Sequence, residues 1–297
     1  MFCLYFGFNI MPASSETLSL YIQFLARSFK SVQSIQNYVS GVKLMHILAN
    51  LLCPQFEAVE LKLAIRGMRR VKKHTPKQAL PITPDILIKI RQTLDISLPV
   101  QAVFWSMSLL AFFTMARKSN LVPLTPSTFD KDKQLCRRDI ISDKDCLLVR
   151  IKWSKTNQFS QRILYVPLVS MPESALCPVA AYKNMLSLLP GQGVKPAFFI
   201  IKNGRPEPFL YKYFQSMIKT SVSKIGLQPQ SYSSHSLWRG GATTAFRAKV
   251  PPELIQLQGD WASDAYKHYL HYDLKDRAVV SSNLRKYIAT VESHISS

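Results

Sequence analysis

The chain has 297 residues, of which 47% are hydrophobic and 19% are charged, and this composition predicts one large or two ordinary globular domains and excludes a disordered chain. Its 38 lysines and arginines against 18 acidic residues give a formal net charge of +20. A basic surface of this size attracts polyanions, so nucleic acid is the expected partner. The basic residues spread along the whole chain and not along one amphipathic helix, so we do not expect a membrane as partner.

The cysteine pattern gives no sign of a disulfide framework or a zinc site. The five cysteines form no CxxC pair and leave one odd residue: Cys3, Cys53, Cys136, Cys146 and Cys177. Such a pattern favours reduced thiols in a cytoplasmic or nuclear protein. We therefore expect no metal ion.

The N-terminal part of the chain is expected to be helical. The opening "MFCLYFGFNI" is apolar but lacks the basic start and cleavage site of a signal peptide. We interpret it as core and leave open that the domain is truncated at its start. Residues 16–29 and 34–52 carry apolar side chains at helical spacing, with Ser34 as an expected N-cap.

A basic cluster ends the next helical stretch. Its members are Arg66, Arg69, Arg70, Lys72 and Lys73. A solvated helix face would explain the cluster, but the net charge favours a strap that lies on a DNA backbone. Pro76 and Pro81 follow and stiffen an extended connection. We therefore place a helical domain at 1–74, a linker at 75–82 and a second domain at 83–297.

The second domain is expected to be mainly helical around a small antiparallel β-sheet. A helix over 83–94 leads into the apolar stretch 100–116, a buried helix that ends at Arg117 and is too short and too polar to span a membrane. The alternating runs "CLLVRIKWSK" and "RILYVPL" flank a polar turn and predict a hairpin. The following stretches, 177–189, 208–226, 235–249, 251–261 and 263–272, indicate helices.

Four polar residues stand out in chain order: Arg117, Lys155, His235 and Tyr269. Taken singly, each has an ordinary explanation, namely a helix cap, a turn lysine, a satisfied histidine at a helix start and a half-buried core tyrosine. Their order along the chain is what points to a function.

With these residues the sequence resembles the tyrosine recombinase (phage integrase) superfamily, and in particular the eukaryotic Crypton-like integrases of mobile elements. The resemblance covers nearly the whole chain, in "MPASSETLSLYIQFLARS", "PKQALPITPDIL", "ARKSNLVP", "WSKTNQFSQRILYVPL", "HSLWRGGATTAFRAKVPPELIQLQGDW" and "SDAYKHYL". It implies a helical, SAM-like core-binding domain and a catalytic domain that close as a C-shaped clamp on double-stranded DNA. It also implies a nuclear protein that works as a homotetramer on paired sites.

The resemblance also implies a role for each of the four residues. Tyr269 resembles the nucleophile, which forms a 3′-phosphotyrosine and so needs neither ATP, a metal nor another cofactor. Arg117 resembles the first of two arginines that hold the phosphate, and His235 the histidine that accompanies them, because charge grows on the phosphate oxygens during cleavage. Lys155 resembles the general acid that protonates the departing 5′ oxygen.

Two positions depart from the superfamily pattern. Asp260 stands nine residues before Tyr269, where His or Trp is usual, although "GDW" fits the Crypton-like branch. Trp238 occupies the position of the second phosphate-holding arginine, three residues after His235. Arg239 is adjacent but lies about 100° further around a helix, so we do not expect it to replace that arginine. An indole brings one N–H donor and no charge, so we expect catalysis to be impaired in this copy.

Two hypotheses on function therefore stay open. The chain is either a DNA strand-transfer enzyme that cleaves and rejoins specific sites, weakened by Trp238, or a catalytically inactive DNA-binding protein derived from a mobile element. A type IB topoisomerase-like enzyme shares the chemistry but fits the motif spacing less well.

Overall fold

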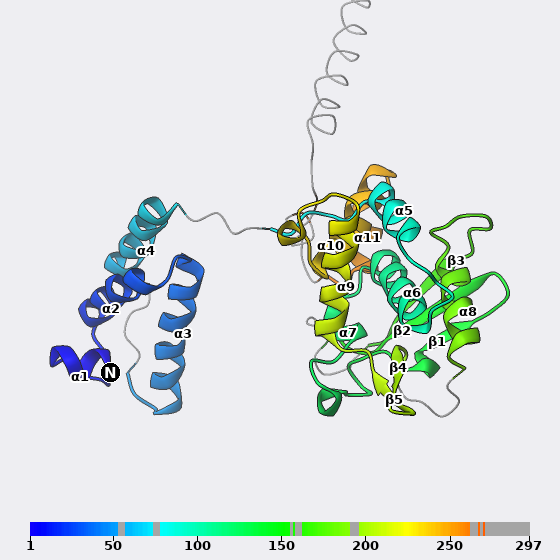
Figure 1. Ribbon diagram of the computed structural model, residues 1–297. Coiled ribbons are helices and arrows are strands. Elements are labelled where there is room, and N and C mark those ends of the chain that lie inside the picture. Colours follow the sequence, from blue (N-terminus) through cyan, green and yellow to red (C-terminus); the bar gives the residue numbers. More distant parts are fainter. Residues whose placement is uncertain are drawn as a thin grey trace, which may run out of the picture. The chain divides into compact units, whose positions relative to one another are not determined.

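The computed structural model describes residues 1–52, 57–73, 78–154, 157, 162–190, 196–261, 267 and 270. Their contacts divide the chain into two compact units, Met1–Gln78 and Ala79–Ser297 (Figure 1). Residues 79–82, which the sequence assigns to the linker, are part of the second unit. There the backbone N–H of Leu80 donates to Ser231 O (2.8 Å) and that of Ile82 to Ser236 O (2.8 Å).

The first unit is helical in all its described regular elements. The helices are α1 (Phe2–Phe6), α2 (Ser15–Ser28), α3 (Val32–Leu48) and α4 (Val59–Lys72). Helix α2 begins at Ser14, whose side chain accepts a hydrogen bond from Thr17 N (3.0 Å) and so satisfies one free N–H of the first turn. The apolar face of α2, with Leu18, Ile22 and Leu25, packs on α3 and α4 and forms a small core.

The apolar opening segment is not core, contrary to the expectation from its composition. Helix α1 has no buried residue, and Leu4 and Tyr5 are largely exposed. Two rings of α1 face α2: that of Phe2 lies 5.1 Å from the ring of Tyr21, and that of Phe6 lies 6.2 Å from the ring of Phe24. A five-residue helix can bury only one side, so its apolar composition overstates its burial.

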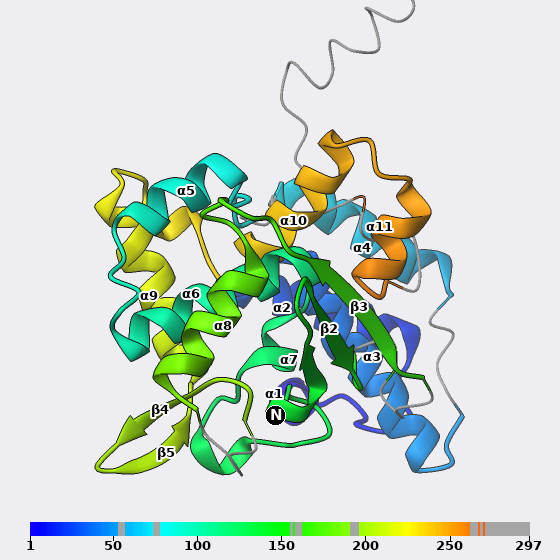
Figure 2. The ribbon, with the colours of Figure 1, turned by 90° about the vertical axis from the view of Figure 1, so that its right-hand side faces the viewer.

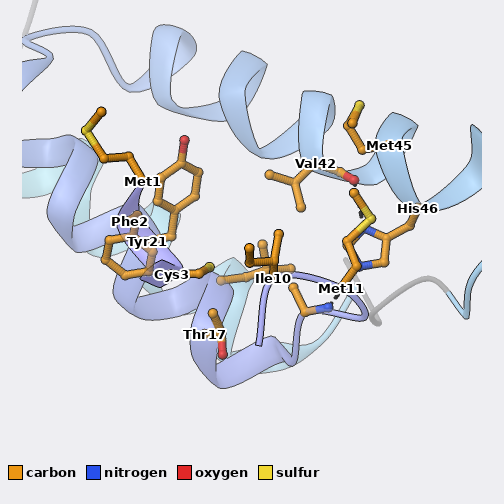
Figure 3. A pocket seen from close by; sticks show the side chains of 12 residues that line it. Met1, Phe2, Cys3, Ile10, Met11, Thr17, Tyr21, Val42, Met45 and His46 are labelled. Carbon is orange, nitrogen blue, oxygen red and sulfur yellow. Dashed lines mark hydrogen bonds between the residues drawn. The ribbon is translucent and has the colours of Figure 1, made fainter. Parts of the chain in front are cut away.

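A cavity of about 270 Å³ lies among α1, α2 and α3, and Figure 3 shows its lining. His46 of α3 is fully buried at its edge and is held by two hydrogen bonds: Nε2 accepts from Ala13 N (2.9 Å) and Nδ1 lies 2.8 Å from Val42 O. The remaining lining is mainly apolar and includes Tyr21 and Met45. The histidine therefore fastens the loop before α2 to α3.

The second unit is built around helix α6 (Pro99–Thr114). Most of its residues are buried, and it lies between α10 (His235–Arg247) and α8 (Pro178–Leu188) (Figure 1). Other helices of the unit are α5 (Pro84–Gln92), α7 (Lys118–Leu121), α9 (Tyr211–Lys224) and α11 (Pro252–Gln258). Among the described residues, no helix combines the length and apolarity that a membrane span requires.

The predicted hairpin is part of a three-stranded antiparallel sheet. Strands β1 (Ile140–Ser142), β2 (Cys146–Ile151) and β3 (Leu164–Val169) lie in that order, with Ile151 opposite Leu164. Figure 2 shows β2 and β3 side by side. Alternate residues of β2 are buried, as the alternating sequence predicts. A second sheet, β4 (Phe199–Lys202) with β5 (Arg205–Pro208), was not predicted, because two prolines interrupt the alternation in β5. The mainly helical fold class is confirmed.

Two consecutive glycines let α10 approach its neighbours closely. A Cβ at Gly240 would lie 1.8 Å from the carbonyl oxygen of Ile82, and one at Gly241 would lie 2.0 Å from that of Phe112 in α6. Both obstacles are backbone atoms, which cannot swing aside. The Gly-Gly pair therefore sets the distance between α10 and the central helix, and with it the position of the residues that begin α10.

We expect Gly241→Ala to destabilise the second unit by about 2 kcal/mol or more, because overpacking against backbone outweighs the helix propensity of alanine. The matched control is Gly67→Ala in α4, where a Cβ meets open space. That substitution should stabilise the first unit by about 0.5 to 1 kcal/mol. Denaturant unfolding of both variants checks this. Unchanged stability of Gly241→Ala would show that α10 is not held so close to α6.

Candidate active site

Arg117 lies in the short connection between α6 and α7. Helix α6 ends at Thr114 and not, as expected, at Arg117, since Met115 turns into the left-handed region (φ 52°). Thr114 closes the helix by donating to Leu110 O (2.6 Å) and accepting from Ala116 N (3.2 Å). Arg117 is then the half-buried N-cap of α7. Arg117 therefore lies just beyond the end of the most buried helix of the unit, at the start of α7.

His235 begins α10, as predicted, and its side chain is exposed. The pKa of its imidazole is lowered, first by partial desolvation and then by the positive charges of Lys118, Arg239 and Arg117. These charges come from both α7 and α10. The structure therefore gathers three cations around one histidine, and the neutral form of His235 is favoured near neutral pH.

We expect the pKa of His235 to lie below about 6.5, the usual value for histidine, and to rise in Lys118→Ala, because that variant removes the positive charge that lowers it most. NMR titration of the imidazole C–H signals measures it, with His235→Gln to assign the signal. Lys89→Ala on α5 is the matched control and should leave the pKa unchanged. Equal values in wild type and Lys118→Ala would contradict the proximity of the two residues.

Trp238, at the position of the expected second arginine, is a buried residue with 5% of its surface exposed. Its ring lies 6.1 Å from that of His235 and 5.8 Å from that of Trp261. The indole is part of an apolar cluster with Met115, Ala242, Ile255, Trp261 and Leu270. Arg239 is buried as well, with 6% exposed. Trp238 thus fills the space beside His235 with apolar surface.

The stem of the β2–β3 hairpin is joined to the end of α11. The carboxylate of Asp260 accepts hydrogen bonds from Ser154 Oγ at the end of the first arm and from Arg162 Nη2 at the start of the second. Lys155, the expected general acid, is outside the described residues and follows Ser154 directly in the chain. The amide of Asn120 in α7 donates to Trp153 O (2.5 Å), so the same stem also contacts the helix that Arg117 begins.

Tyr269, the expected nucleophile, is likewise outside the described residues. Leu270 is described, and it is buried in the apolar cluster of Trp238 and Trp261. Leu270 therefore shares an apolar cluster with Trp238 and Ala242 of α10. The predicted helix over 263–272 falls mostly outside the described residues.

The predicted DNA-binding cluster lies at the C-terminal end of α4 in the first unit, whereas His235 and its neighbours belong to the second. Arg66, Arg69 and Arg70 are exposed on α4 at spacings of three and four residues, and Lys73, the residue that caps the helix in the left-handed conformation, is exposed next to them. Lys72 differs, because it is half-buried and its ammonium donates to Ala26 O. Arg66 and Arg69 also line a groove of about 680 Å³ between α3 and α4, together with Lys43 and Lys62.

Several residues near the site were not found from the sequence. Lys118, Asn120, Ser154 and Arg162 have no pattern that distinguishes them from ordinary polar residues, and only their contacts reveal them. In the described part of the chain, no group of three His, Cys, Asp or Glu residues is arranged to hold a metal ion.

Comparison of sequences finds no matching family model and no matching curated protein. Comparison of structures finds many matches, among them site-specific recombinases and integrases bound to DNA. The XerH site-specific recombinase in its post-cleavage complex with palindromic difH has a TM-score of 0.60 and 18% identity, over 90% of this chain and 70% of that one. The Tn1549 transposon integrase with transposon right end DNA has a TM-score of 0.60 and 17% identity, over 93% and 87%. A lambda integrase dimer on a COC′ core site has a TM-score of 0.53 and 15% identity, over 90% and 81%.

A further match, to XerH in its pre-cleavage complex, has a TM-score of 0.48 and 16% identity over 75% of this chain, and spans 63% of that recombinase, less than two thirds of its length. All of these identities are low, so the matches describe the fold and leave the activity to be argued from the residues. The chain has the tyrosine recombinase fold, the fold of these site-specific recombinases and integrases.

Proposed function

We propose that the protein binds double-stranded DNA and derives from a tyrosine recombinase that cleaves and rejoins specific sites through a 3′-phosphotyrosine. One observation carries the proposal: Arg117, Lys118 and Arg239 bring their positive charges to His235 at the start of α10. Three cations around an exposed imidazole repel one another and favour an anion between them. A DNA phosphate is the anion that fits the net charge of +20.

The proposed chemistry uses the residues that match the superfamily motifs. The phenol oxygen of Tyr269 attacks phosphorus, and the bond from phosphorus to the 5′ oxygen breaks. Lys155 supplies the proton that the departing 5′ oxygen takes up. Arg117 and His235 stabilise the charge that grows on the non-bridging oxygens. The phosphotyrosine conserves the bond energy, so a second strand can be rejoined without a metal or another cofactor.

Trp238 is proposed to impair this reaction. In the superfamily pattern its position supplies a second arginine, which contacts the phosphate with two parallel N–H donors. A buried indole among Met115, Ile255 and Trp261 offers no such pair. If the protein makes this contact at all, the adjacent Arg239 of α10 would have to make it.

The second candidate function is DNA binding without catalysis, by a protein derived from a mobile element. The burial of Trp238 in an apolar cluster favours it, because the side chain there stabilises packing and does not face a phosphate. For either candidate we propose a Crypton-like origin and a nuclear location, and for the active form a homotetramer on paired sites.

The test separates binding from cleavage. Binding is measured on a duplex, and cleavage is measured as a covalent protein–DNA adduct on a nicked duplex that cannot be rejoined. We expect the wild-type chain to bind DNA and to form little adduct, and Tyr269→Phe to form none. Absence of DNA binding at low salt would refute both candidates, whereas abundant adduct in the wild type would refute the impairment by Trp238.

A further inference from the structure

Asp260 has an unusual backbone conformation that aims its side chain at the hairpin. It lies in the left-handed region (φ 49°), which among residues with a Cβ suits mainly Asp and Asn. The residues on either side explain the turn. A Cβ at Gly259 would lie 2.0 Å from the ring of Trp261, so that ring folds over the glycine and packs on Trp238. Gly259, Asp260 and Trp261 thus form a corner between the hairpin and α10.

The carboxylate of Asp260 contacts the two arms of the hairpin at the same level. One oxygen accepts from Ser154 Oγ and the other from Arg162 Nη2. The side chain of Asp260 is 11% exposed, while that of Arg162 is 59% exposed. The carboxylate of Asp260 therefore links the two arms of the hairpin, although it is 106 residues from Ser154 and 98 residues from Arg162 in the sequence.

The rest of the stem is held together by Asn157. Its amide group donates to Lys152 O (3.2 Å) and to Arg162 O (2.6 Å), and its backbone N–H donates to Ser154 Oγ (3.1 Å). Ser154 is therefore shared: its hydroxyl accepts from Asn157 and donates to Asp260. Loss of the carboxylate would free Ser154, and with it the point from which the chain continues to Lys155.

We propose that Asp260 is a positioning residue that fixes Ser154 at the end of the first arm, the residue that directly precedes Lys155 in the chain. The assignment deepens the proposed function, because it rests on Lys155 as the general acid. A His or Trp at this position would be expected to contact the phosphate directly. The role proposed for Asp260 is different, because it acts on the hairpin. The acidic side chain suits it, since a carboxylate accepts from both donors but would repel a phosphate.

The kinetic test uses the chemistry of the leaving group. In the cleavage step the Tyr269 oxygen bonds to phosphorus, the 5′ oxygen leaves with the proton of Lys155, and the phenolic proton is released to solvent. A 5′ sulfur at the scissile bond leaves as a thiolate, which is far less basic than an alkoxide and needs no proton. A residue that acts through the general acid should therefore matter for oxygen and not for sulfur.

We expect Asp260→Asn, made in a Trp238→Arg background so that cleavage is measurable, to slow single-turnover cleavage of the 5′-oxygen duplex by about tenfold or more. Cleavage of the 5′-sulfur duplex should change by less than about threefold, because the general acid is not needed there. Arg162→Ala should behave in the same way, and Arg162→Lys, which keeps the charge, should restore most of the rate. Equal slowing on both duplexes would overturn the proposal, since it would place Asp260 at the phosphate or in general stability.

A second measurement needs no activity and uses the otherwise unaltered chain. We expect Asp260→Asn and Arg162→Ala to speed hydrogen exchange of the Asn157 amide at least tenfold, while amides of α6 keep their protection. The side chain of Arg162 is largely exposed, so we expect Arg162→Ala to fold. This variant therefore tests the proposal even if Asp260→Asn does not fold. Unchanged exchange at Asn157 would overturn the proposal. If exchange rises but the Trp238→Arg protein cleaves neither duplex, the hold of Asp260 on the hairpin stands and the proposed catalytic function fails.

Discussion

Trp238→Arg is expected to raise covalent adduct formation on nicked DNA by at least about tenfold, and by up to about 10²–10³-fold, the effect of restoring one preorganised donor at a developing charge. DNA affinity should change far less than the rate, because the contact strengthens as charge develops on the phosphate. Quantifying the adduct over time at saturating protein measures the rate, and a binding titration of the same duplex measures the affinity.

The structure adds a cost to this substitution. Trp238 is 5% exposed and packs against Trp261, so its removal leaves space in the cluster. Replacement of a buried tryptophan by a smaller side chain commonly costs about 3 to 5 kcal/mol. An arginine avoids burying its charge by extending its guanidinium past the cluster toward His235. We therefore expect the variant to be less stable than wild type but more active. Improved packing would raise stability, so it could not explain such a result.

Three controls make the result specific. Trp238→Phe keeps an apolar ring and should stay as inactive as wild type. Trp238→Lys restores a charge without the two-pronged geometry and should recover less activity than arginine. Tyr269→Phe added to Trp238→Arg should abolish the adduct. If wild type already cleaves as fast as Trp238→Arg, Arg239 fills the position of the second arginine and our account of Trp238 is wrong.

Removal of the exposed basic residues at the C-terminal end of α4 and at its cap is expected to have the largest effect on binding. The variant replaces Arg66, Arg69, Arg70 and Lys73 with alanine and keeps Lys72, whose ammonium is bonded to Ala26 O. Each phosphate neutralised contributes about 0.9 to the slope of log K against log salt, so four lost contacts should flatten the slope by about 3 to 4 units. Affinity at about 0.1 M salt should fall on the order of 10³-fold.

Binding titrations of one duplex at several salt concentrations measure this effect. They should show little dependence on sequence, because phosphates carry no base identity. A matched variant removes the same number of charges elsewhere: Arg205, Lys212, Lys219 and Lys224, of β5 and α9, are replaced by alanine. If both variants weaken binding equally, net charge alone explains the result. If the α4 variant binds like wild type, the cluster is only a solvated helix face.

Much of the local structure was predictable because its signals are local. The helical spacing of apolar residues predicted α2, α3, α6 and α10, and the alternation in β2 and β3 predicted their hairpin. The sequence pattern gave the wrong prediction for the burial of α1 and missed the strand β5. The five-residue α1 is apolar yet has no buried residue, and β5 is a strand despite two prolines.

The sequence by itself contains the order of Arg117, Lys155, His235 and Tyr269, the charge of +20 and the tryptophan at position 238. The order of the four residues, with the motifs around them, is enough to predict the recombinase fold. Only the tertiary structure decided that Lys118 lies near His235, that Trp238 is buried against Trp261, and that Asp260 bonds to Ser154 and Arg162. Helix and strand periods report only which side of an element is buried. Contacts between residues about one hundred positions apart depend on how elements pack, and here the two glycines of α10 and the left-handed turn at Asp260 set that packing.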